Sequence, residues 1–170
     1  MTIVTVGRPS RAATIGWVGA ACRLVLAGVW IYAGAAKVGD LDASVRAVKA
    51  YQILPAGVAE VVGAALPLVE IALGVLLLVG LATRVAAAAS AVLLLAFIAG
   101  VASAWARGLR IDCGCFGSGG ELAPGESPQY AVEIVRDVGF LAAAAFLLVW
   151  PRTRLSLDAR VHEREELRSR

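Results

Sequence analysis

The sequence predicts an all-α integral membrane protein built as a bundle of four transmembrane helices. Two observations lead to this prediction. The apolar fraction is 59% and the charged fraction 17%, with a mean hydropathy of +0.78, and the apolar residues lie in long runs. Soluble domains are nearer to about 45–50% apolar and about 25% charged. They also interrupt apolar runs with polar residues at helical spacing.

Four stretches are long enough to cross a bilayer, whose hydrocarbon core takes roughly 20 apolar residues in a helix. They span residues 15–36, 57–82, 84–106 and 131–150. We therefore expect one membrane domain over residues 15–150, preceded by a short N-terminal segment, 1–14, and followed by a charged tail, 151–170. The short Thr83-Arg84 connection predicts that the second and third spans form an antiparallel hairpin.

The connection between the first two spans has a helical pattern of its own. Leu41, Val45 and Val48 recur at helical spacing, with Arg46 and Lys49 between them. This pattern predicts a short amphipathic helix that lies in the membrane interface. A solvated connector helix accounts for the same residues equally well.

The distribution of Lys and Arg predicts the orientation, because cytoplasmic loops carry an excess of these residues. With four spans both termini share one side, and that side is the slightly richer in Arg. We expect a multi-pass plasma-membrane protein with cytoplasmic termini and an extracytoplasmic loop between the last two spans. The net charge of +3 and the lack of a basic face with interleaved aromatic residues argue against nucleic-acid binding.

The extracytoplasmic loop contains the pair Cys113-Gly114-Cys115 within the run from Asp112 through Phe116 to Gly117. A one-residue spacing forces a small, strained disulfide ring, and strain makes such a bond easier to reduce. The ring closes too short a loop to be a strong structural staple. The pair therefore favours a redox-active dithiol/disulfide, and a structural or incidental pair stays open as the alternative.

Two further features bear on the chemistry of this loop. Lys37 and Arg136 are expected near the same membrane face, where a cation favours the thiolate form of a cysteine. A metal site is a third alternative, but the only histidine, His162, lies in the tail, so zinc would need Asp112 or a second chain. We predict no metal.

Two charged residues fall inside the predicted spans. Counting about 1.5 Å per residue places Arg23 and Glu70 at nearly the same depth, and an unpaired charge there is costly. We predict an Arg23–Glu70 ion pair, which either locks the bundle or serves a function. Pro67 predicts a kink and a cavity beside Glu70. A lipid-soluble quinone is a candidate for this cavity, although no residue pattern identifies one.

The remaining polar residues of the membrane segments are expected to be unremarkable in role. Glu60 and the group of Glu133, Arg136 and Asp137 are predicted to lie near the outer surface, solvated at the interface. Cys22, beside Arg23, is interpreted as a small packing residue that lies too deep to reach the loop.

The Asp112–Gly117 run resembles the signature of the MauE (methylamine utilisation) membrane proteins, which are similar to the wider DoxX group. Arg23, Ala33-Gly34 and Lys37 in the first span support the resemblance, as does the run from Glu70 to Gly74 that leads to Thr83-Arg84. The likeness covers roughly residues 15–150. It implies a four-helix membrane protein that assists thiol–disulfide chemistry outside the cytoplasm with a thioredoxin-like partner. In the family's named pathway this chemistry supports disulfide formation in methylamine dehydrogenase.

We therefore expect Cys113 and Cys115 to exchange disulfides with an extracytoplasmic thioredoxin-fold protein, one attacking and the other resolving the mixed disulfide. Which cysteine attacks, and in which direction electrons flow, stay open. Two other classes of function also stay open: a non-catalytic scaffold for a redox complex, and a small-solute transporter that depends on Glu70.

Overall fold

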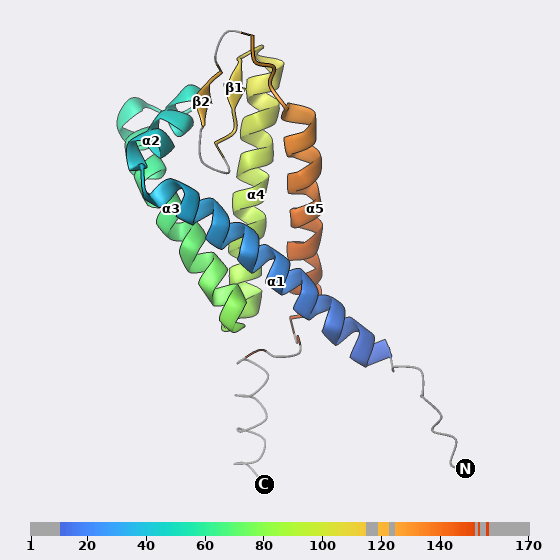
Figure 1. The fold of residues 1–170 in the computed structure, drawn as a ribbon. Coiled ribbons are helices and arrows are strands. Elements are labelled where there is room, and N and C mark those ends of the chain that lie inside the picture. The colour runs from blue at the N-terminus through green and yellow to red at the C-terminus, as the bar shows by residue number, and fades with distance from the viewer. Residues whose placement is uncertain (1–10, 115–118, 123–124, 152, 154–155, 157–170) are drawn as a thin grey trace, which may run out of the picture.

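The computed structural model describes residues 11–114, 119–122, 125–151, 153 and 156, and places five helices and one short hairpin in them (Figure 1). The elements are α1 (Arg11–Val38), α2 (Leu41–Ala50), α3 (Ala56–Val79), α4 (Thr83–Ala106), β1 (Ile111–Asp112), β2 (Gly120–Glu121) and α5 (Tyr130–Val149). The predicted spans correspond to α1, α3, α4 and α5. Cys115, Phe116, segment 1–10 and most of the charged tail lie outside the described residues.

Three helices of the described chain are long and apolar enough to cross a membrane: Ala13–Val38, Ala56–Val79 and Thr83–Ala106. Their outer faces carry many exposed aliphatic side chains, among them Val61, Val85 and Val92. Charged side chains such as Arg23, Lys37 and Glu70 are instead buried between the helices. Aliphatic residues outside and paired charges inside are the arrangement that a hydrocarbon solvent favours. The protein is a multi-pass helical membrane protein.

The fourth expected span, α5, differs from these three in composition. It has 20 residues, and its first half carries Glu133, Arg136 and Asp137. The helix lies beside α4 and also packs against α1 (Figure 1). These three charged side chains, gathered in one helix of 20 residues, distinguish α5 from the three helices that are long and apolar enough to cross a membrane.

α1 crosses the bundle diagonally and packs most closely on α3 (Figure 1). A methyl group added at Gly34 would lie 2.6 Å from Pro67 O, and one added at Gly74 would lie 2.9 Å from Ile31 N. Such approaches are possible only where a residue lacks a side chain, as at many membrane helix interfaces. The two glycines therefore set how α1 and α3 align.

This alignment shows that the predicted Arg23–Glu70 ion pair is wrong. The Arg23 guanidinium donates to the carbonyls of Leu77 at 2.8 Å and Leu78 at 3.1 Å. The carboxylate of Glu70 instead accepts from Lys37 Nζ, at 2.5 and 2.7 Å. The depth estimate failed because it counted from the ends of the apolar runs, whereas the glycine contacts determine the actual register and place Arg23 beside the last turn of α3.

The connection between α3 and α4 is as short as predicted, and the two helices are consecutive and antiparallel. Gly80 ends α3 in a left-handed conformation with φ of 71°, and its N–H donates to Leu76 O at 2.9 Å. Glycine adopts this conformation without the steric penalty of other residues. α4 then begins at Thr83.

The helix predicted between the first two spans is α2. Asp40 caps it by accepting from Ala43 N at 2.8 Å. Its buried face is formed by Ser44 and Ala47, and Ser44 Oγ donates to Gly63 O of α3 at 2.7 Å. α2 is therefore packed on the bundle, which excludes the freely solvated connector.

Candidate functional site

The β1–β2 hairpin places Asp112, Cys113 and Gly114 at the end of the bundle that also carries α2 (Figure 1). The strands pair antiparallel, with Ile111 opposite Glu121 and Asp112 opposite Gly120. The side chain of Tyr130, at the start of α5, accepts from Ile111 N at 3.0 Å. The hairpin is thus tied to the first turn of α5, directly before the charged residues of that helix.

Two glycines allow the hairpin to approach α2. Gly114 has φ of 69°, and a methyl group added there would lie 2.8 Å from Ala47 Cβ. One added at Gly119 would lie 2.4 Å from Gly114 Cα. The tightest constraint on Gly114 is therefore this contact with Ala47 of α2.

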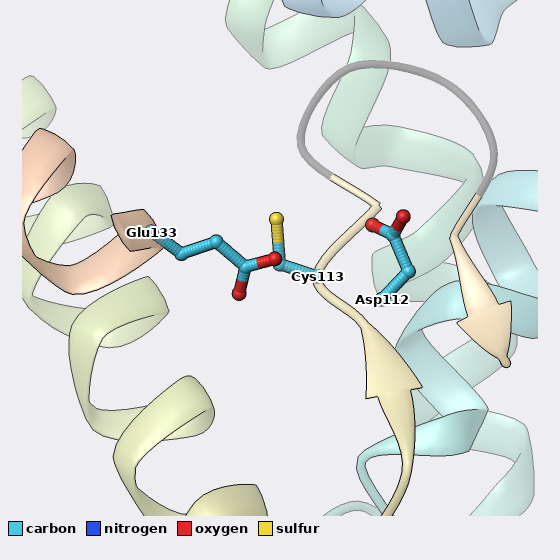
Figure 2. Close-up of side chains that lie close together, drawn as sticks. All are labelled: Asp112, Cys113 and Glu133. Carbon is cyan, nitrogen blue, oxygen red and sulfur yellow. The ribbon is translucent and has the colours of Figure 1, made fainter. Parts of the chain in front are cut away.

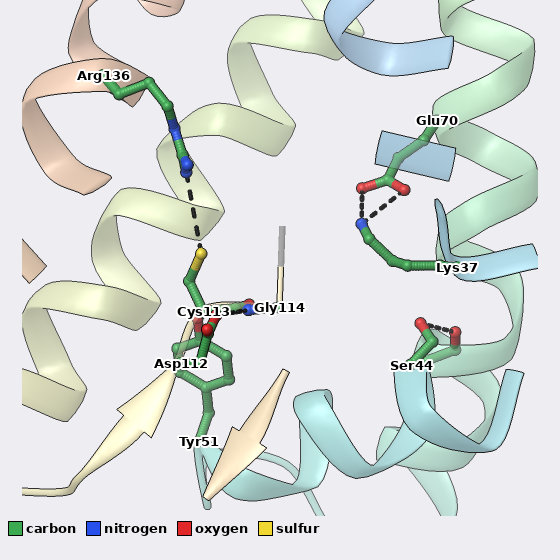
Figure 3. Close-up of polar contacts among 9 residues, drawn as sticks. Lys37, Ser44, Tyr51, Glu70, Asp112, Cys113, Gly114 and Arg136 are labelled. Carbon is green, nitrogen blue, oxygen red and sulfur yellow. Dashed lines mark hydrogen bonds and ion pairs between the residues drawn. The ribbon is translucent and has the colours of Figure 1, made fainter. Parts of the chain in front are cut away.

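Polar contacts hold the loop backbone around the first cysteine (Figure 3). Gly114 N donates to Asp112 Oδ1 at 2.9 Å, and Tyr51, the residue that follows α2, donates from its hydroxyl to Cys113 O at 3.1 Å. Asp112 therefore positions the turn in which Cys113 lies. The hydroxyl of Tyr51 is a contact that the sequence pattern did not indicate.

The thiol of Cys113 is half-buried and faces Arg136 of α5 (Figure 3). Arg136 Nη2 lies 3.9 Å from Cys113 Sγ, and Arg136 Nε donates to Asp137 Oδ1 at 3.0 Å. A guanidinium at this distance stabilises the negative charge of a thiolate. Arg136, which the sequence analysis expected only near the same membrane face as the loop, thus lies next to Cys113.

Glu133 is the functional candidate that sequence reasoning missed. Its carboxylate points from α5 toward Cys113 (Figure 2), and it is 7% exposed. Within the described residues, its Oε2 has no hydrogen-bond partner. The prediction that Glu133 and Asp137 are solvated at the interface is wrong, since Asp137 is 3% exposed. The spacing of Glu133, Arg136 and Asp137 places all three on one face of a helix. This shared face was the signal in the sequence that could have identified Glu133 as a neighbour of Arg136.

The same carboxylate belongs to a cluster that suits a metal ion in donor type. One oxygen each of Asp112 and Glu133 and the Sγ of Cys113 lie within 4.8 Å of one another (Figure 2). Three such donors leave a tetrahedral ion short of a fourth ligand. Arg136 also brings a positive charge to the sulfur that would bind the metal. The surroundings of Cys113 therefore favour a thiolate paired with a guanidinium over a metal ligand.

Lys37 lies on the side of Cys113 opposite to Arg136, and its ammonium group forms an ion pair with the carboxylate of Glu70 (Figure 3). The two side chains are only 2% and 0% exposed. Lys37 and Cys113 nevertheless line one cavity, whose empty space is about 340 Å³ including the part open to the outside. A second cavity of about 320 Å³, measured in the same way, lies beside Glu70 and Arg136, and Phe97 lines both. A cavity beside Glu70 is thus confirmed.

Two other predicted residues are remote from this site. Arg23 lies beside the end of α3 at Leu77 and Leu78. Cys22 is half-buried and packs against the core cluster around Leu26 and Leu77, consistent with its interpretation as a packing residue. Fifteen residues of helix, about 22 Å, separate Cys22 from Lys37.

Comparison with known proteins adds the family. The family model described as methylamine utilisation protein MauE matches residues 15–150. This chain belongs to the MauE family. It is 38% identical over 100 residues to the methylamine utilization protein MauE of Paracoccus denitrificans, an alignment that covers 58% of this chain and 54% of that protein. The aligned part therefore spans about half the length of the curated relative. No solved structure matches the chain.

MauE membership confirms the resemblance that the Asp112–Gly117 run indicated. The matched residues end at Trp150, so that the charged tail lies outside the family match. The two described members of the Cys-Gly-Cys motif, Cys113 and Gly114, lie at the contact between the hairpin, α2 and α5. The further likeness to DoxX stays a prediction.

Proposed function

We propose that this MauE-family protein is a thiol–disulfide oxidoreductase of the plasma membrane, which acts on an extracytoplasmic thioredoxin-fold partner through Cys113 and Cys115. The observation that supports this most directly is the half-buried Cys113 thiol, with Arg136 Nη2 at 3.9 Å and the buried carboxylate of Glu133 beside it. A thiolate is the attacking species in disulfide exchange. α5 thus places beside the Cys113 thiol a cation that stabilises the thiolate and a carboxylate that can accept the thiol proton.

The exchange moves two electrons and two protons between the two proteins. In the oxidising direction, a partner thiolate attacks the Cys113–Cys115 disulfide and forms a mixed disulfide with one of its sulfurs. The second partner thiolate attacks that bond, so that the partner leaves as a disulfide and the motif as a dithiol. Arg136 stabilises the motif thiolate that leaves when the disulfide is attacked. Glu133 transfers a proton to or from that sulfur. The reverse sequence reduces the partner.

The membrane arrangement in this proposal has four crossings, with α5 as the fourth. Its 20 residues match the minimum length of a span. The start of α1 and the end of α5 lie at the same end of the bundle, and the hairpin lies at the other (Figure 1). The excess of Arg near the two termini supports their cytoplasmic location, which puts the hairpin outside.

The physiological role follows from the family. Because the matching family is described by methylamine utilisation, we propose that the chain supports maturation of a disulfide-containing protein of methylamine metabolism. Oxidation of such a protein takes place outside the cytoplasm, where disulfides persist. The proposed location of Cys113 satisfies this requirement.

A trapping experiment tests the proposal. In intact cells that express tagged variants, Cys115→Ser and Cys113→Ser should each prevent turnover, and one of them should accumulate a mixed disulfide with a thioredoxin-fold protein. Cys22→Ser is the matched control and should behave as the unmodified chain, because Cys22 packs in the core. A membrane-impermeant maleimide should label the pair in intact cells after reduction. Full activity of both loop variants would refute the redox role and favour a scaffold.

A further inference from the structure

Asp137 is a buried carboxylate to which the proposed exchange assigns no role. It is 3% exposed and lies on α5 next to Arg136, whose Nε donates to its Oδ1 at 3.0 Å. Its second oxygen, Oδ2, has no hydrogen-bond partner in the part of the chain that the structure describes. A carboxylate loses favourable hydration when it is buried, so a buried one requires a partner that compensates for this loss. For Asp137 that partner is the guanidinium of Arg136.

The guanidinium of Arg136 contacts Asp137 and Cys113 at the same time. Its Nη2 lies 3.9 Å from Cys113 Sγ (Figure 3), while its Nε donates to Asp137. A guanidinium is planar and rigid, so a bond that fixes Nε also fixes the direction of the N–H groups on Nη2. The side chain of Arg136 is 26% exposed, and its rotamer entropy opposes a single orientation. The bond to Asp137 therefore favours the orientation in which Arg136 faces the thiol.

The other charges around Cys113 make the orientation of Arg136 important. One carboxylate oxygen each of Asp112 and Glu133 lies within 4.8 Å of Cys113 Sγ, and a nearby negative charge opposes the formation of a thiolate. Lys37 forms an ion pair with Glu70. Arg136 is the cation that the structure places against the sulfur. How closely it approaches therefore determines how much of the thiol is ionised.

We propose that Asp137 is a positioning residue, which holds the Arg136 guanidinium against Cys113 and thereby keeps the thiol in its ionised, reactive form. The inference rests on the proposed function, because disulfide exchange requires that thiolate. It gives Asp137 an effect opposite to that of its own charge. As a charge alone, a carboxylate near Cys113 disfavours the thiolate, whereas as an acceptor for Arg136 Nε it keeps a cation beside the sulfur. The sign of the effect therefore separates positioning from simple electrostatics.

The test compares two substitutions of Asp137 in the purified full-length protein in detergent micelles. Asp137→Asn removes the charge but keeps an oxygen that can accept from Arg136 Nε, whereas Asp137→Leu has a similar shape and no acceptor. Every protein, including the parent, carries Cys115→Ser, so that the loop offers a single thiol. Alkylation of Cys113 by iodoacetamide is followed across a range of pH, and mass spectrometry identifies the alkylated site.

We expect Asp137→Leu to slow the alkylation of Cys113 about tenfold near neutral pH and to move the midpoint of the pH profile upward by about one unit. The rate at high pH, where the thiol is fully ionised, should not change, because access to the sulfur stays the same. Asp137→Asn should react at least as fast as the parent. Arg136→Gln/Asp137→Leu should be no slower than Arg136→Gln, because both substitutions remove the same interaction.

Two controls accompany these variants. Glu60→Leu removes the carboxylate of the exposed Lys49–Glu60 pair and should leave the pH profile of Cys113 unchanged. Cys22, which packs against the core, is an internal reference in every protein, and its alkylation rate should stay the same. If Asp137→Leu does not fold, Asp137→Ala, which also lacks an acceptor, takes its place.

The outcomes separate this inference from the proposed function. Alkylation in Asp137→Leu that is as fast as in the parent, or faster, overturns the positioning role. Equal slowing by Asp137→Leu and Asp137→Asn also overturns it, and so does a changed rate at high pH. Since alkylation needs no partner protein, the expected Asp137 effects without any trapped mixed disulfide would overturn the proposed function alone. A trapped mixed disulfide without those effects would overturn only the role of Asp137.

Discussion

The Lys37–Glu70 ion pair gives the sharpest test of the fold, because the sequence pattern predicted a different partner for Glu70. We consider the substitution Lys37→Met, which keeps the length and apolar stem of the side chain and removes its charge. The carboxylate of Glu70 would then remain fully buried but would lack its counterion. In the wild-type structure both Glu70 oxygens accept from Lys37 Nζ, at 2.5 and 2.7 Å.

The expected magnitude follows from these distances and from the burial. At an effective dielectric constant of about 20, two unit charges this close attract by roughly 6 kcal/mol. Desolvation of both groups offsets much of that attraction, so that the net value of the pair is small. Removing one partner leaves the desolvation of the other uncompensated. We therefore expect Lys37→Met to lower the free energy of unfolding by about 3–5 kcal/mol.

The assay is reversible unfolding in detergent micelles, followed by circular dichroism, for a double-mutant cycle. Lys37→Met/Glu70→Gln should be more stable than Lys37→Met, because the double variant buries no unpaired charge. Lys49→Met is the matched control, and it should change stability far less, since the Lys49–Glu60 pair is exposed to solvent. The same cycle for Arg23 and Glu70 should be additive within about 0.5 kcal/mol.

A cost of Lys37→Met that is no larger than that of Lys49→Met would refute this reasoning. So would a clear coupling energy between Arg23 and Glu70 in the absence of one between Lys37 and Glu70. Either result would mean that α1 and α3 align differently from the arrangement set by Gly34 and Gly74.

The remaining predictions concern the cysteine loop. Arg136→Gln should slow alkylation of Cys113 by iodoacetamide about tenfold near neutral pH, because the guanidinium that stabilises the thiolate is lost; an unchanged rate would contradict this role. Glu133→Gln should slow disulfide exchange in stopped-flow assays while the fold persists, because an amide cannot accept the thiol proton; equal rates would exclude Glu133 as the proton acceptor. Gly114→Ala should cost about 1–3 kcal/mol in unfolding, since its φ is 69° and the added methyl group meets α2, whereas Gly139→Ala, with open space around it, should not destabilise the protein. A chelator should leave the alkylation rate of Cys113 unchanged, and a faster rate after metal removal would instead support the metal cluster.

The sequence alone determined the elements that depend on local composition. Apolar run length gives the long helices, because a bilayer-spanning helix requires about 20 apolar residues whatever its neighbours are. The structure places α3 at Ala56–Val79 and α4 at Thr83–Ala106, close to the predicted 57–82 and 84–106. The Cys-Gly-Cys motif likewise identified the family and the loop, since both are properties of consecutive residues.

Only the tertiary structure decided which distant side chains meet. Glu70 pairs with Lys37 and not with Arg23 because close contacts at Gly34 and Gly74 set the alignment of α1 with α3. Apolar periodicity carries no information on that alignment, since each helix presents similar aliphatic faces at every depth. Glu133 reaches Cys113 because Tyr130 ties the hairpin to the start of α5, a contact between residues 19 positions apart. A charge in a membrane helix indicates that it needs a partner, and the packing of the helices determines which partner it finds.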